Sequence, residues 1–162
     1  TLDQSNAYHF TTNWIVPASA ESIYSLLAAA EDLPRWWPSV YLAVEQTKQG
    51  NGDGLGAEFS LYTKGWLPYT LRWSFRVTAI ERPTKLALDA WGDFVGTGLW
   101  TLRQDGYTTN TTYDWKVVAE KPLLRRFSFL FKPIFSANHK WAMARGEESL
   151  LAELDRRGQL NH

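Results

Sequence analysis

The 162-residue sequence predicts an α+β protein in which a curved antiparallel sheet of about seven strands wraps round a long C-terminal helix. Through most of residues 40–120, apolar and polar side chains alternate with a period of two, which is typical of strands with one buried face. After Pro122 the apolar positions recur with the helical period of 3.6 residues. Only the last helix is long enough to cover the apolar face of the sheet, so we expect residues 1–162 to form a single domain.

The first elements are a strand and one or two short helices. Residues 8–16, YHFTTNWIV, place aromatic side chains on one side of a strand that Pro17 ends. Ser19 is a candidate N-cap for a helix of about ten residues. We expect that helix to stop near Pro34, because the residue before a proline avoids the helical region. The stretch DLPRWWPSVY at 32–41 then forms a loop or a short second helix.

The rest of the sheet follows without a break. Six further strands are predicted, at residues 40–47, 57–63, 69–80, 84–91, 94–103 and 108–120. The clearest alternation, in residues 69–80, points Tyr69, Trp73 and Phe75 to the inner face and arginines to the outer face. The long helix is expected over about residues 135–157, kinked or begun afresh at Pro133. Its inner stripe consists of His139, Met143, Gly146, Leu150 and Leu154.

Composition excludes several kinds of site. The 17 basic and 17 acidic residues balance, so the chain lacks the basic excess that nucleic-acid binding demands. Without cysteine there is no disulfide, thiolate nucleophile or cysteine-ligated metal. His9 points outward and His162 ends the chain, so neither shares a site with His139 and we expect no metal. No nucleotide-binding or nucleophile motif is present, and we expect no cofactor.

Targeting signals are also missing from this sequence. It contains no run of eighteen apolar residues, and its first residues form neither a basic nor an apolar signal region. We therefore expect a cytoplasmic location. The number of subunits is left open.

Aromatic residues are unusually abundant, at 15% of the chain. Large rigid rings on the inner face favour an apolar pocket for a flat or lipid-like molecule, because such rings line ligand sites preferentially. A filled core built from the same rings is the alternative.

Residues 14–40, WIVPASAESIYSLLAAAEDLPRWWPSV, resemble the first strand and helices of the START-like helix-grip superfamily (SRPBCC), in particular its bacterial polyketide cyclase/dehydrase-like branch. The turn GWLPYTLRW, the hairpin LALDAWGDFVGTGLWTL, TTYDW and the closing ESLLAELDRR are similar as well, and together they cover nearly the whole chain. The resemblance implies a START/Bet v 1-like helix-grip fold. It does not fix the chemistry, because such folds serve lipid carriers, hormone receptors, cyclases and aromatase-like enzymes.

We expect this chain to bind a hydrophobic small molecule, such as a lipid, a polyketide or another aromatic or isoprenoid-like compound, between sheet and C-terminal helix. By the resemblance, Trp37 turns toward the open end of the sheet, while Trp36 caps the outside or the next helix. The candidate ligand-binding residues are Trp37, Phe59, Tyr69, Trp73, Phe75, Trp100, Tyr113, Trp115, Phe135, His139 and Met143.

Two alternatives stay open. As an enzyme, the chain would perform the aldol-type cyclisation or dehydration that the resemblance implies, with His139 as acid or base and Tyr69 or Tyr113 polarising a carbonyl. As a lipid transfer protein, it would touch membranes transiently through residues 125–141, where aromatic and basic side chains interleave.

Overall fold

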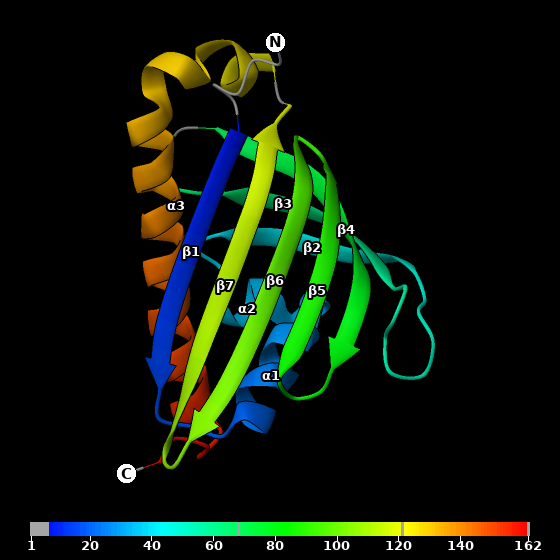
Figure 1. Cartoon of the computed structure of the whole chain (residues 1–162), viewed down its shortest axis with the longest axis vertical. Coiled ribbons are helices and arrows are strands. Elements are labelled where there is room, and N and C mark those ends of the chain that lie inside the picture. The colour runs from blue at the N-terminus through cyan, green and yellow to red at the C-terminus, as the bar shows by residue number, and fades with distance from the viewer. Residues whose placement is uncertain (1–6, 68, 121, 162) are drawn as a thin grey trace.

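One antiparallel sheet of seven strands, in the order β1-β7-β6-β5-β4-β3-β2, forms the body of the structure (Figure 1). This computed structural model describes residues 7–67, 69–120 and 122–161, without the side chains of residues 122–125 and 127–131. The strands are β1 (Ala7–Val16), β2 (Tyr41–Lys48), β3 (Glu58–Lys64), β4 (Thr70–Glu81), β5 (Lys85–Gly92), β6 (Phe94–Asp105) and β7 (Thr108–Ala119). The predicted helix-grip fold is confirmed, and every strand boundary lies within two residues of its predicted position.

The helices are α1 (Ala20–Ala28), the short 3-10 helix η1 (Ala30–Asp32), α2 (Leu33–Trp36) and α3 (Pro122–Arg156). Figure 1 shows the sheet curving so that β2, β3 and β4 pass behind the other strands, with α1 and α2 inside the curve and α3 alongside β1. None of the helices in the described residues has the length and apolar character that a membrane crossing requires.

The alternation of the sequence produces the two faces of the sheet. In β4 the inward residues Leu71, Trp73, Phe75 and Val77 are buried, while Arg72 and its outward neighbours are exposed or half-buried. Burying one aromatic or aliphatic side chain of this size contributes about 1.5–3 kcal/mol, so the inner face is the main source of stability.

The helical segments differ from the prediction in two details. The first helix ends at Ala28, and Pro34 lies in the first turn of α2. Pro34 therefore marks the start of α2 and not the end of α1, because a proline in the first turn of a helix loses no intrahelical hydrogen bond. Helix α3 begins at Pro122 and runs through Pro133 without a new start. Figure 1 shows that its first turns bend away from the long axis of the rest, as an internal proline makes a helix do.

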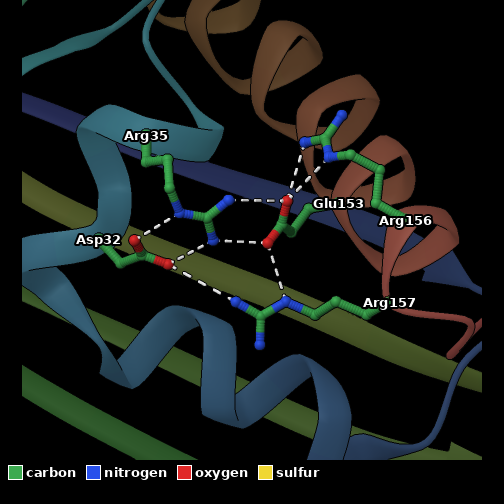
Figure 2. Close-up of polar contacts among 5 residues, drawn as sticks. All are labelled: Asp32, Arg35, Glu153, Arg156 and Arg157. Carbon is green, nitrogen blue, oxygen red and sulfur yellow. Dashed lines mark hydrogen bonds and ion pairs between the residues drawn. The ribbon is translucent and has the colours of Figure 1, made fainter.

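A buried carboxylate joins α2 to the end of α3 (Figure 2). The side chain of Glu153 is 3% exposed and accepts hydrogen bonds from Arg35, Arg156 and Arg157 at 2.6–2.8 Å. Arg35 also donates to Asp32, at 2.6 and 2.7 Å. The hydrogen bonds from Arg35 and then from the other two arginines lower the pKa of Glu153 to about 2. Asp32 directly precedes α2 and Arg35 lies within it, so the cluster anchors this short helix. It thereby fixes Trp36, the last residue of α2, and Trp37, which follows it.

Candidate functional site

The sheet and α3 enclose a cavity of about 120 Å³. Its walls come from β1, the end of α2, the strands β2, β3, β4, β6 and β7, and the middle of α3. Ten of the 21 lining residues are Phe, Tyr or Trp, and the polar groups include histidine, tyrosine, threonine and asparagine side chains. The space is therefore apolar, with a few points at which a hydrogen bond can form.

Eight of the predicted ligand-binding residues line this cavity: Trp37, Tyr69, Trp73, Tyr113, Trp115, Phe135, His139 and Met143. Trp37 directly follows α2, Tyr69 directly precedes β4, and the others come from β4, β7 and α3, so segments far apart in the sequence meet around one space.

The other three predicted residues lie on the same face without lining the cavity. Phe59 lines a separate, more open groove of about 410 Å³ between η1 and strands β3 to β5. Phe75 separates the two spaces, because its ring centroid lies 5.1 Å from that of Phe59 and 6.2 Å from that of Trp73. Trp100 stacks behind Tyr113 at 4.2 Å. Alternation assigns a side chain to a face, but it does not say how far along the strand the open space extends.

Sequence reasoning missed several lining residues. Tyr8 and Phe10 were on the correct face of the first strand but were not selected as ligand contacts. Tyr41 begins β2, whose side chains are mostly exposed, so no alternation marked it. Asn138 and Lys64 are polar, so a search for apolar lining residues passed over them.

His139 faces the cavity from α3. Its ring stacks on Phe10 with centroids 4.2 Å apart and an angle of 14° between the planes. Its Nε2 atom is buried and has no hydrogen-bond partner among the described residues. Burial lowers the pKa of His139 to about 4, so the imidazole is neutral at pH 7. A neutral imidazole can accept or donate one hydrogen bond, or take up a proton from a ligand.

Four tyrosines line the cavity, and the pKa values of three of them, Tyr41, Tyr69 and Tyr113, are shifted. Burial raises the pKa of Tyr69 to about 12, and it raises the pKa values of Tyr41 and Tyr113 further. All three phenols stay protonated at neutral pH and act as hydrogen-bond donors rather than as bases.

Trp37 lines the cavity on the side next to α2, and Trp36 packs against it. Trp37 and Trp36 are each 2% exposed, and their rings stack at 5.7 Å. Trp37 lines the cavity, whereas the prediction that Trp36 caps the outside is wrong, because both indoles are buried. Gly146 on α3 makes room for the pair, since a Cβ atom at this position would overlap the indole of Trp37.

Asn138 of α3 and Gly65 of the β3–β4 loop both line the cavity. The side-chain oxygen of Asn138 accepts hydrogen bonds from the backbone N–H groups of Trp66, at 2.9 Å, and Leu67, at 3.2 Å. Trp66 and Ile134, one helical turn before Asn138, remain 49% and 41% exposed. Two apolar side chains thus stand in water near this contact between α3 and the β3–β4 loop.

The predicted membrane segment 125–141 is described only in part. The side chains of 125 and 127–131, including Phe127, Phe129 and Phe131, lie outside the described residues. Within the described part, the ammonium group of Lys132 lies 4.9 Å from the ring centre of Tyr8, and Trp141 is packed against the core.

Comparison with known sequences gives one family. The model of the family described as polyketide cyclase / dehydrase and lipid transport matches residues 7–155. A search of curated proteins found no match.

Solved structures share the fold at low sequence identity. The Zhui aromatase/cyclase from Streptomyces sp. R1128 is similar with a TM-score of 0.75 and 16% identity, over 93% of this chain and 95% of that chain. A START superfamily protein from Mycobacterium smegmatis gives 0.73 and 15%, over 91% and 97% of the two chains. The di-domain ARO/CYC BexL from the BE-7585A biosynthetic pathway gives 0.65 and 12%, over 90% and 50%. These likenesses establish the architecture alone.

Proposed function

The chain belongs to the family of polyketide cyclases, dehydrases and lipid transport proteins, and on that premise we propose that it binds a hydrophobic small molecule in the cavity between the sheet and α3. The cavity, with its many aromatic lining residues, is the observation that carries this proposal. A flat apolar molecule that enters a space of this size removes its own apolar surface and that of the walls from water, which favours binding. The eight predicted residues that line the cavity would contact the molecule.

A matched pair of variants on α3 tests the proposal. Ala142 lines the cavity, whereas Ala144 is exposed on the same helix. Replacing Ala142 by Phe fills the cavity, so we expect benzene binding, followed by chemical shifts of backbone amides, to be lost. The variant Ala144→Phe should bind benzene like the parent protein. Unchanged amide shifts in parent protein saturated with benzene would contradict the proposal, as would full binding by Ala142→Phe.

His139 supports catalysis as a second candidate function. Its unpartnered Nε2 can accept a proton from a bound carbonyl compound, because the lowered pKa keeps the ring neutral at pH 7, but the same shift makes it a weak base. Such a step would be the cyclisation or dehydration named in the family description, with Tyr69 or Tyr113 donating to the carbonyl oxygen. In that case His139→Ala abolishes turnover of a poly-carbonyl substrate while the substrate still binds. Equal turnover by the variant would eliminate this role.

Exposed Trp66 and Ile134 favour lipid transfer as a third candidate, because exposed apolar side chains suit contact with a membrane surface. Transfer predicts that the double variant Trp66→Ser, Ile134→Ser loses binding to phosphatidylcholine vesicles in a flotation assay. The small volume of the cavity places this candidate behind the binding of a small molecule.

A further inference from the structure

Two phenol groups of the cavity, from the buried Tyr113 and the half-buried Tyr41, make no hydrogen bond to the described protein. Tyr41 and Tyr113 both line the cavity, and in the described part of the chain neither hydroxyl oxygen has a hydrogen-bond partner. Tyr113 is only 8% exposed. Because a hydroxyl that is cut off from water without a partner costs about 1–3 kcal/mol, a ligand that fills the cavity is expected to offer these two phenols an acceptor.

The two rings are held firmly in place. Tyr113 stacks between Trp100 at 4.2 Å and Trp115 at 5.7 Å. Its hydroxyl lies beside Gly98, where a Cβ atom would come within 2.8 Å of the oxygen. The edge of Tyr41 meets Trp37 at 5.0 Å with an angle of 71°. Because neither ring can easily turn away, both hydroxyls are preorganised for a partner inside the cavity.

Tyr41 also affects the pKa of Tyr113. Burial is the main cause that raises the pKa of Tyr113, and the neighbouring Tyr41 adds to it. The phenols are thus near enough for their charges to interact, and both remain donors at neutral pH. A carbonyl oxygen has two lone pairs and can accept from both donors at once.

The size of the cavity limits the rest of the molecule. Its 120 Å³ is close to the roughly 150 Å³ of an engineered cavity that binds benzene, and below the roughly 300–1,000 Å³ of pockets for drug-sized ligands. The space suits one aromatic ring better than a long acyl chain or several fused rings.

We propose that the cavity takes a compound with a single aromatic ring and a carbonyl group, whose oxygen accepts hydrogen bonds from Tyr41 and Tyr113. This inference rests on the proposed binding function and adds to it the size of the ligand and its polar group. The aromatic walls sandwich the ring, and the two phenols fix the direction of the carbonyl.

Acetophenone and α-methylstyrene form the matched probe pair, because they share ring and shape and differ in a C=O against a C=CH2 group. We expect the parent protein to bind acetophenone about threefold to tenfold more tightly, as one or two neutral hydrogen bonds provide. Tyr41→Phe and Tyr113→Phe should each remove much of this preference and leave α-methylstyrene binding unchanged. Amide chemical shifts of Gly65 and Ala142, which line the cavity, report the binding.

Tyr24→Phe is the control, since Tyr24 is equally buried but lies outside the cavity lining. It should keep the preference for acetophenone. The two-ring ketone 2-acetonaphthone should bind at least about tenfold more weakly than acetophenone, because it exceeds the available volume.

The outcomes separate this inference from the function on which it rests. Equal binding of acetophenone and α-methylstyrene by the parent protein, or a preference that survives both phenylalanine variants, overturns the role of the phenols and leaves ligand binding intact. Tight binding of 2-acetonaphthone overturns the size limit. Failure of every probe to shift the cavity amides overturns both this inference and the proposed function.

Discussion

Removing the charge of Glu153 should destabilise the protein measurably at neutral pH and little at low pH. The arginines lower the pKa of this carboxyl from 4.5 to about 2, and each unit corresponds to about 1.36 kcal/mol. The full shift therefore corresponds to about 3 kcal/mol of stability. Its arginine partners are 41–59% exposed, so solvent screens part of the attraction, and we expect about 2 kcal/mol for Glu153→Gln.

The pH dependence follows from the direction of the shift. A carboxyl whose pKa is lower in the folded state contributes its stability fully above about pH 4.5 and loses it as the pH falls toward 2. The difference between parent and Glu153→Gln should thus shrink to less than half at pH 3. At pH 7 the variant should melt about 4–8 °C lower, as expected for a chain of this length.

Urea unfolding at pH 7 and pH 3, followed by tryptophan fluorescence, measures both quantities. Glu148→Gln is the control, because Glu148 pairs with Arg145 on the same helix but is 63% exposed, and it should change stability by less than about 0.5 kcal/mol. The reasoning fails if Glu153→Gln behaves like this control at pH 7. It also fails if the loss at pH 3 equals the loss at pH 7.

Three further predictions concern the cavity. Gly146→Ala should destabilise the protein by about 1–3 kcal/mol in urea unfolding, although alanine favours helices, because the new methyl group meets Trp37; a gain in stability would contradict this contact. The imidazole of His139 should titrate near pH 4 by NMR, and the stability that depends on it should fall as the pH drops from about 6.5 to 4; a titration near 6.5 would show an exposed ring. Asn138→Ala should speed hydrogen exchange of the Trp66 amide at least about tenfold without changing exchange in β7, and unchanged exchange at Trp66 would show that other contacts hold the loop.

The strands could be predicted closely from the sequence, because alternation is a local property of each segment. The 108–120 prediction matches β7 nearly residue for residue, and its inward Tyr113 and Trp115 do line the cavity. In contrast, Tyr41 lies on a strand with mostly exposed side chains, so local pattern says nothing of its role. The prediction that Trp100 lines the cavity was wrong for the opposite reason. Trp100 lies on the correct face of the sheet, but it is behind the ring of Tyr113.

The features that could not be predicted from the sequence are contacts between segments far apart in the chain. The fit of Trp37 against Gly146 depends on how α2 meets α3, and neither residue has a local signal for it. The predicted helical stripe contained Gly146 without a reason for a glycine there. Similarly, Glu153 reads as an ordinary helix surface residue until Arg35 is brought to it by the fold.

The Asn138 contact lets one wall of the cavity move without unfolding of the whole protein, because Asn138 and Gly65 of the β3–β4 loop both line the cavity. One side-chain oxygen holds two N–H groups of the β3–β4 loop, and two hydrogen bonds are a small fraction of the free energy that the sheet contributes. The loop can therefore open by a local fluctuation, on a timescale of microseconds to milliseconds, while every strand stays paired. We expect the rate at which a molecule enters or leaves to respond to changes in this loop, and the melting temperature to remain almost constant.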